Sequence, residues 1–335
     1  MLGRRFATRI NAFASGAGGY WPDLGDGRPT LDRMVRRAAT VEGLTEVDLN
    51  YPDHVGADPA AAGRAVADCG LAVNGLAMRY YSDPAFRLGA FTHPDRAVRR
   101  RALDLTRRGI DAARAMGAPM MTLWLGQDGF DHAFQCDYAR LWDDEVAGLA
   151  EVAAHDPGCL ISVEYKPDEP RARAVLRDAA TTLLAIAEAG APNLGVTLDV
   201  AHSLYAGEQP AFAAELILRK GRLLGLHLND GYGRRDDGLM VASVNEQATL
   251  ELLRAAARGG YAGAVYFDTF PDASGLDPVA ECAANIRTVR RMMGAVARLE
   301  GDNRLAEAQA RHDPVIAQEA ARTALAAATL AVGLG

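Results

Sequence analysis

Residues 194–202 read LGVTLDVAH, a short apolar run that ends in an acid, Asp199, followed three positions later by His202. Three other segments repeat this pattern of an apolar run with a ligand-type residue at its end. They are ISVEYKP (161–167) with Glu164, LLGLHLND (223–230) with His227 and AVYFDTF (264–270) with Asp268. Such runs predict buried parallel strands. Because the carboxyl ends of the strands in a parallel α/β barrel meet on one face, we expect these side chains to form one cluster.

Strand and helix patterns alternate along the rest of the chain. The eight strand candidates lie at residues 4–13, 45–51, 71–81, 119–126, 160–166, 194–200, 223–229 and 264–270. A Gly-rich loop at 14–29 follows the first strand, and helical patterns lie at 31–39, 59–70, 94–117, 137–155, 171–190, 209–221, 245–260 and 277–300. Eight βα units with short connections favour an α/β fold of the (β/α)8 TIM barrel type. A doubly wound sheet is the alternative, but no GxGxxG motif opens an early helix.

The end of the chain lies outside the eight units. We therefore divide the chain into a barrel catalytic domain at residues 1–300 and a helical C-terminal extension at residues 301–335. The extension is rich in alanine, and a helix with an apolar stripe usually packs on a neighbouring surface, often another subunit. This indicates a homodimer or homotetramer, and a frayed tail is the alternative.

The composition limits the classes of function. The chain has 335 residues, is 49% hydrophobic and carries a net charge of −7, which suits an enzyme with a large core and disfavours nucleic acid as a partner. The four cysteines form no CxxC pair, which is typical of a reducing compartment. No secretory signal pattern or membrane-length apolar run occurs, so we expect a cytoplasmic protein with no membrane partner.

The cluster at the strand ends predicts a metal site. Three acids and one imidazole at one point would repel one another without a cation. Oxygen-rich ligands with imidazole suit Mn²⁺, Mg²⁺ or Co²⁺ better than a structural zinc, and we expect Mn²⁺. Asp199 and His202 could reach one ion or two adjacent ions. Asp236, in the long loop NDGYGRRDDG (229–238), is a candidate ligand for a second ion, and an Asx-rich turn is the alternative.

A lysine and several aromatic residues accompany the cluster. Glu164 and Lys166 are two positions apart on a strand, so both side chains face the barrel mouth, where an ammonium group could polarise a substrate carbonyl. A surface ion pair is the alternative. Trp124, Tyr81 and Phe130 could form an apolar wall that excludes water from a bound sugar, and ordinary packing is the alternative for each.

At these residues the chain resembles the xylose isomerase family of metal-dependent aldose–ketose isomerases, in the broad sense that includes rhamnose isomerase-like members. The resemblance covers about residues 71–270 and rests on TLWLGQDGFD (122–131), VEYKP (163–167) and LDVAH (198–202). The segment HLNDGYGRRDDGLMV (227–241) is most similar to the rhamnose isomerase-like branch. The resemblance implies one metal ion held by Glu164, Asp199, His227 and Asp268, and a second, catalytic ion near Asp199, His202 and Asp236. It also implies that Lys166, His202 and Asp236 are catalytic.

Two positions depart from the family's pattern. Gly238 stands where related enzymes can supply another carboxylate, which would leave the second ion with fewer ligands. The family's ring-opening His–Asp pair has no clear match, although Asp48, Asn50 and His54 lie in the corresponding segment.

The expected function is an aldose–ketose isomerase that acts on a free monosaccharide by a 1,2-hydride shift. A ketose 3-epimerase on the same barrel would use two opposed carboxylates, commonly glutamates, whereas this chain offers the shorter Asp268 and a lysine that epimerisation does not explain. A metal-dependent lyase or dehydratase acting on a cyclitol is a further alternative. A three-zinc DNA-repair endonuclease is disfavoured by the seven histidines and the negative charge. A non-catalytic sugar-binding barrel would bind its ligand without metal or turnover.

Overall fold

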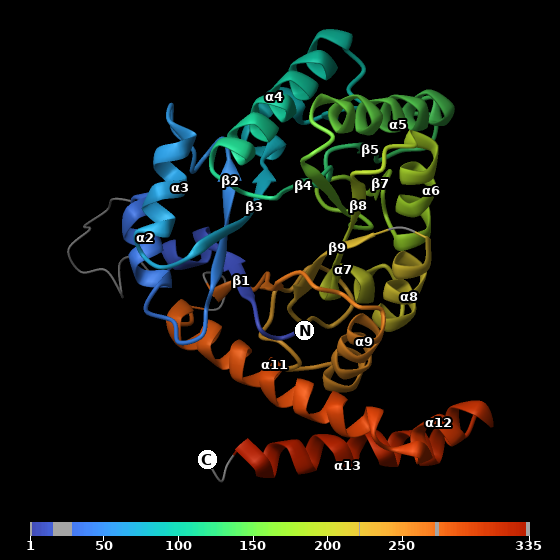
Figure 1. Ribbon diagram of the computed structural model, residues 1–335. Coiled ribbons are helices and arrows are strands. Elements are labelled where there is room, and N and C mark those ends of the chain that lie inside the picture. The colour runs from blue at the N-terminus through green and yellow to red at the C-terminus, as the bar shows by residue number, and fades with distance from the viewer. Residues whose placement is uncertain (1, 16–28, 221, 272–274, 333–335) are drawn as a thin grey trace.

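The computed structural model describes residues 2–15, 29–220, 222–271 and 275–332, so most of the Gly-rich loop expected at 14–29 lies outside the described residues. A closed barrel of parallel strands forms the centre, in the order β1-β10-β9-β8-β6-β4-β3-β2 (Figure 1). The strands are β1 (Phe6–Arg9), β2 (Glu46–Tyr51), β3 (Ala72–Met78), β4 (Met120–Trp124), β6 (Leu160–Glu164), β8 (Leu194–Asp199), β9 (Leu223–Leu228) and β10 (Val265–Phe267). The predicted (β/α)8 TIM barrel is confirmed.

Helices surround the barrel, as the ring of coiled ribbons in Figure 1 shows. They are α2 (Leu31–Ala38), α3 (Pro59–Ala67), α4 (Arg96–Ala115), α5 (Tyr138–His155), α6 (Ala179–Ala189), α8 (Pro210–Lys220), α9 (Glu246–Arg258) and α11 (Pro278–Glu300). Aspartates cap several of them: Asp58, Asp95, Asp137, Asp178 and Asp277 each accept a hydrogen bond from a first-turn backbone N–H. A cap of this kind contributes about 1 kcal/mol and fixes where the helix begins.

The strands separate a large apolar layer from a polar interior. Leu226 and Leu228 of β9 are fully buried in the main hydrophobic cluster, which includes apolar residues of the surrounding helices. Because side chains alternate along a strand, the intervening positions face the barrel axis. Many of these inward positions are small or polar, and the hydroxyl oxygens of Ser162 and Thr197 lie 2.5 Å apart. The side chain at the last inward position of each strand therefore faces a common space at the carboxyl rim.

Two local predictions are wrong. The helix expected at 171–190 begins only at Ala179, because Asp178 accepts a hydrogen bond from the Thr181 N–H and the preceding residues join a small antiparallel pair. That pair consists of β5 (Gly129–Phe130) and β7 (Arg173–Ala174). Residues after β8 were expected to form a loop, but they form the short helix α7 (Val200–Tyr205), which carries His202.

The C-terminal helices are present and lie against the outside of the barrel. Helix α12 (Asn303–Ala310) and helix α13 (Pro314–Val332) are separated at His312, which has a φ of 54°. Helix α13 runs along α11, so the extension packs on the last barrel helix (Figure 1). Across the described ranges, the structure has no helix with the length and apolar character needed to span a membrane.

Candidate metal centre and active site

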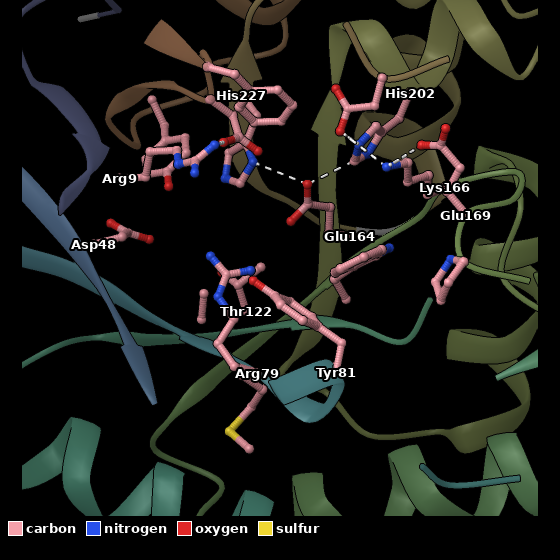
Figure 2. A pocket seen from close by; sticks show the side chains of 18 of the residues that line it. Arg9, Asp48, Arg79, Tyr81, Thr122, Glu164, Lys166, Glu169, His202 and His227 are labelled. Atoms are coloured by element: carbon pink, nitrogen blue, oxygen red, sulfur yellow. Dashed lines mark hydrogen bonds and ion pairs between the residues drawn. The ribbon is translucent and has the colours of Figure 1, made fainter. Parts of the chain in front are cut away.

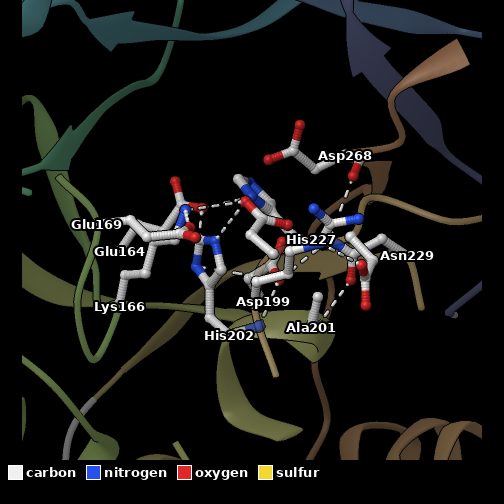
Figure 3. A network of polar contacts seen from close by, with 12 residues as sticks. Glu164, Lys166, Glu169, Asp199, Ala201, His202, His227, Asn229 and Asp268 are labelled. Atoms are coloured by element: carbon white, nitrogen blue, oxygen red, sulfur yellow. Dashed lines mark hydrogen bonds and ion pairs between the residues drawn. The ribbon is translucent and has the colours of Figure 1, made fainter. Parts of the chain in front are cut away.

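Four side chains converge at the carboxyl rim of the barrel. Glu164, Asp199 and His227 lie on β6, β8 and β9, and Asp268 directly follows β10. One ligand atom from each residue lies within 4.8 Å of the ligand atoms of the other three (Figure 3). The rim thus gathers residues from a segment of more than 100 positions, Glu164 to Asp268, into a space that one ion can fill, as the strand-end pattern predicts.

Asn229 fixes the orientation of Asp199. Its Nδ2 donates hydrogen bonds to both carboxylate oxygens of Asp199, at 3.1 and 2.9 Å, and to the backbone carbonyl of Asp268 at 3.1 Å (Figure 3). The Asp199 carboxylate also caps α7 by accepting a hydrogen bond from the His202 N–H at 3.0 Å. Such partners orient a ligating carboxylate before any ion arrives.

His227 has the features of a metal ligand. Its ring stacks on Tyr266 with a centroid distance of 4.1 Å, which holds the imidazole in one plane. Its Nδ1 is buried and lies 3.5 Å from Glu164 Oε1, but no group in the described part of the chain forms a hydrogen bond with it. A buried imidazole nitrogen that forms no hydrogen bond and lies beside a carboxylate fits the donor set of a divalent cation. The residues present therefore fit the metal that the sequence predicts.

The electrostatics of the cluster show how strongly it needs positive charge. Burial raises the pKa of Asp199 to about 7, since the ionised carboxylate loses its hydration. Burial also lowers the pKa of His227, but Glu164 outweighs this effect and the pKa rises to about 9. Burial by itself would raise the pKa of Glu164, but the neighbouring histidines outweigh burial and lower this pKa to about 2. Without an ion, protons on the imidazoles compensate the carboxylates.

Lys166 lies beside the cluster and is paired with acids. Its Nζ lies 3.1 Å from Asp236 Oδ2 and 2.9 Å from Glu169 Oε2. The same Asp236 oxygen lies 3.1 Å from His202 Nε2, so it is shared between an ammonium and an imidazole (Figure 2). Burial lowers the pKa of Lys166, but the two acids outweigh it and the net shift is upward, which keeps the ammonium protonated.

The second ion remains a prediction. Within the described ranges, His202 and Asp236 do not form a further group of three ligand-type side chains around one point. Gly238, where related enzymes can supply another carboxylate, has a φ of 56°, and a Cβ there would collide with the Phe270 ring. This backbone position accepts glycine and excludes a longer side chain.

A cavity of about 540 Å³ opens above the cluster. Trp124 and Tyr81 line it and pack edge to face at a centroid distance of 5.5 Å, and Lys166 Nζ lies 5.2 Å from the Trp124 ring centroid. Phe130 does not line the cavity. It lies in β5, and its ring packs on that of Tyr138 at a centroid distance of 4.8 Å, so Phe130 is not part of the cavity wall as the sequence predicted.

Sequence reasoning missed part of the cavity wall. The cavity is also lined by Arg9, Asp48, Arg79, Thr122 and Gln127. Of the three residues considered for ring opening, only Asp48 reaches the cavity, whereas His54 Nδ1 accepts a hydrogen bond from the Asn50 N–H at 3.0 Å. The sequence does place Arg9, Asp48 and Arg79 in or directly after the first three strands. They follow less distinct apolar runs than the candidate metal ligands of the last four strands, so the pattern did not single them out.

The structure is an α/β barrel whose carboxyl rim carries a cluster that could hold a metal ion, and a sequence comparison places the chain in a family. A family profile described as Xylose isomerase-like TIM barrel matches residues 38–293. The chain therefore belongs to the xylose isomerase-like TIM barrel family.

Individual relatives agree with this assignment. The xylose isomerase of Thermus thermophilus is 30% identical over 211 residues, which are 61% of this chain and 54% of the relative. The chain thus spans about half the length of the curated relatives it matches. Among solved structures, an L-ribulose 3-epimerase has a TM-score of 0.65 at 18% identity, with 89% of this chain and 96% of that chain covered. A xylose isomerase domain protein from Alicyclobacillus acidocaldarius has a TM-score of 0.63 at 20% identity, with 88% and 99% covered. These structural likenesses show the fold.

Replacing Asp268 tests the ligand set. In Asp268→Asn the cluster loses one negative charge, and we expect the dissociation constant for Mn²⁺ to rise about 100-fold or more, beyond what the loss of an outer hydrogen bond causes. The electron paramagnetic resonance signal of free Mn²⁺ measures the binding. Asp53→Asn removes an exposed acid elsewhere and is the control. Unchanged Mn²⁺ affinity in Asp268→Asn would show that Asp268 is not a ligand.

The pH dependence of metal binding follows from the shifted pKa values. His227, with its pKa of about 9, is protonated at pH 7.5 in the metal-free protein and must release its proton to bind an ion. We expect release of about one proton per Mn²⁺ at pH 7.5, with affinity that increases about tenfold per pH unit towards pH 9. Calorimetry in buffers of different ionisation enthalpy counts the protons. Binding that is independent of pH would contradict this account.

Proposed function

We propose that the protein is a divalent-metal-dependent sugar isomerase that interconverts an aldose and a ketose of a free monosaccharide. The observation that carries the proposal is the position of Lys166, which lies in the wall of the same cavity as the four-residue cluster. A cation at the cluster would stabilise negative charge that develops on two adjacent sugar oxygens. We expect Mn²⁺, with Mg²⁺ or Co²⁺ as alternatives, and a cytoplasmic homodimer or homotetramer.

The chain's own residues supply orientation and proton transfer. Lys166 would donate a hydrogen bond to the carbonyl oxygen of the open-chain sugar, and its raised pKa keeps it protonated for this role. Asp236 Oδ2 contacts both Lys166 Nζ and His202 Nε2. Lys166 would give a proton to the former carbonyl oxygen and regain one, through Asp236, from the hydroxyl group on the neighbouring carbon, so that each group ends in the protonation state in which it began. The carbon-bound hydrogen moves with its electron pair from C2 to C1, so no external oxidant or reductant is required.

The cavity walls suit this reaction. Trp124 and Tyr81 present apolar ring surfaces beside the Lys166 ammonium, which limits the access of water to the reacting carbons. Tyr266, stacked on His227, forms a further apolar surface next to the cluster. Hydride transfer between neighbouring carbons benefits from a site in which water cannot compete.

A ketose 3-epimerase is the second candidate, because solved 3-epimerases share the fold. Epimerisation by proton transfer needs a base on each face of C3. Here Asp268 lies 3.7 Å from Arg9 Nη1, which acts to lower its pKa, but burial outweighs the arginine and the net shift of the pKa is upward, so the basicity of Asp268 does not separate the two reactions. Lys166 and Asp236 have no task in that reaction. These contacts favour the isomerase.

Isotope transfer separates the two reactions. Metal-stripped protein is supplied with Mn²⁺ and an aldose that carries deuterium at C2, and the expected product is a ketose that retains deuterium at C1. A ketose incubated in D₂O would gain deuterium at C3 if the protein were an epimerase. Ligand binding that survives metal removal, with no ketose formed from any aldose, would support the non-catalytic alternative.

The chain offers a matched pair of lysine variants, because Lys166 and Lys220 are its two lysines. In Lys166→Ala we expect kcat to fall about 10²- to 10⁴-fold, since a charged donor at the reacting oxygen is lost. Mn²⁺ affinity should stay the same or increase, because a positive neighbour of the cluster is removed. Lys220→Ala, on the exposed end of α8, should behave as the parent protein. Normal turnover in Lys166→Ala would remove the lysine from the mechanism.

A further inference from the structure

The carboxyl rim divides into two halves of different charge. The four candidate metal ligands come from β6, β8, β9 and β10, which are consecutive neighbours around the barrel. The remaining strands, β1 to β4, contribute Arg9, Asp48, Arg79 and Thr122 to the same cavity. In Figure 2, Arg9 and Asp48 lie on the side of Glu164 opposite Lys166 and His202. A substrate held at the cluster and Lys166 by its reacting end therefore extends its other end towards the arginines.

Arg79 is the least compensated charge in this half. It follows β3 directly, and its guanidinium lies 5.5 Å from the Tyr81 ring centroid. Its Nε is buried, and in the part of the chain that the structure describes this atom has no hydrogen-bond partner and the guanidinium has no ion pair. A buried guanidinium nitrogen without an acceptor is costly, so such a group usually serves a ligand. The planar guanidinium matches a carboxylate in shape and charge.

Arg9 and Asp48 complete the arginine half of the rim. Arg9 ends β1 and is the register partner of Asp48. Its Nε donates to Asn11 Oδ1 at 3.2 Å, its Nη1 lies 3.7 Å from Asp268 Oδ1, and the side chain lines the same cavity as Arg79. Asp48 Oδ1 accepts a hydrogen bond from Asn74 Nδ2 at 2.7 Å, which holds the carboxylate against β3. Counted without Asp268, which belongs to the four-residue cluster, the two arginines and one aspartate of this half carry a single net positive charge.

We propose that the arginine half of the rim binds a carboxylate at the end of the sugar remote from the reacting carbons, so that the substrate is a uronic acid. One carboxylate balances the single net positive charge, whereas a phosphate dianion would exceed it. A neutral hydroxymethyl group would leave the half-buried Arg79 guanidinium without a counter-charge in the cavity wall. The cavity of about 540 Å³ is large enough for a six-carbon sugar acid. This inference rests on the proposed isomerase function and adds the substrate class.

The experiment compares sugars that differ only at their remote end. The Mn²⁺-loaded protein is given glucose, glucuronate and glucose 6-phosphate, and in parallel galactose, galacturonate and galactose 6-phosphate. Ketose formation gives kcat/KM, and calorimetry gives the affinity for each sugar independently of turnover. We expect each uronate to exceed its neutral counterpart and its phosphate in kcat/KM by about tenfold or more.

Variants of arginine identify the residue responsible. In Arg79→Gln, the ratio of kcat/KM for uronate to that for the neutral sugar should fall by about 30-fold or more, and Arg79→Lys should restore part of it. Arg87→Gln removes an exposed arginine of the same face that does not line this cavity, and should leave the ratio unchanged. Melting temperature and Mn²⁺ content verify that each variant folds. If Arg79→Gln does not fold, the same ratio is measured in Arg79→Lys.

The outcomes separate the inference from the function on which it rests. Turnover of neutral sugars that equals or exceeds that of uronates, preference for a phosphate, or equal losses for both sugars in Arg79→Gln would overturn the inference and leave the isomerase intact. Uronate binding that depends on Arg79 without ketose formation would support the inference and contradict the isomerase.

Discussion

The rim of this barrel is governed by the repulsion between three carboxylates, of which those of Glu164 and Asp199 are buried and that of Asp268 is half-buried. Where two of them are ionised with oxygens 4.8 Å apart, the upper limit within the cluster, the repulsion is roughly 3 to 4 kcal/mol at an effective dielectric constant of about 20. Positive charge in the cluster offsets this repulsion in the folded state. It can come from protons on His202 and His227 or from a divalent cation. The inward, polar positions of the strands, the stacked Tyr266 and the amide of Asn229 all hold the ligand atoms where one positive centre can reach them together.

The structure also divides the site into a rigid part and a part supplied by loops. The metal ligands lie at or beside strand ends, and their positions are fixed by the hydrogen bonds of the barrel. Asp236 instead comes from the loop at 229–238, which is closed by Gly238 packed against Phe270. The tight backbone at Gly238 explains why this chain cannot present a further carboxylate there. Asp236 pairs with Lys166 and His202, so in the proposed function the loop would serve proton transfer and carbonyl binding more readily than a complete second metal site.

The sequence predicts the barrel and its ligand cluster because both depend on local patterns. An apolar run that ends in an acid or a histidine predicts a strand with a polar side chain at its carboxyl end, and in a closed parallel barrel all such ends lie on one face. Phe130 was misplaced because the β5–β7 pair, which turns its ring towards Tyr138, depends on contacts between distant segments. The helix expected from residue 171 fails for the same reason, since its composition suits a helix but Asp178 fixes a later start. The sequence does not predict a shared site for Arg9 and Arg79, because only the closed barrel brings both side chains into the wall of one cavity.

The fold and the cluster alone do not separate an isomerase from an epimerase, because both reactions can use a cation that binds two neighbouring sugar oxygens. The difference must come from groups that face the substrate from outside the cluster. On one side, an ammonium held by Asp236 suits stabilisation of a carbonyl oxygen, which a hydride shift requires and a pair of carbon bases does not. On the opposite side, Arg9 of β1 and Arg79 after β3 would act, as we propose, on the part of the sugar that does not react. The reaction class and the substrate class would then depend on different halves of one rim, so that a change in the arginine half would alter the preferred sugar while the cluster and Lys166 retain their chemistry.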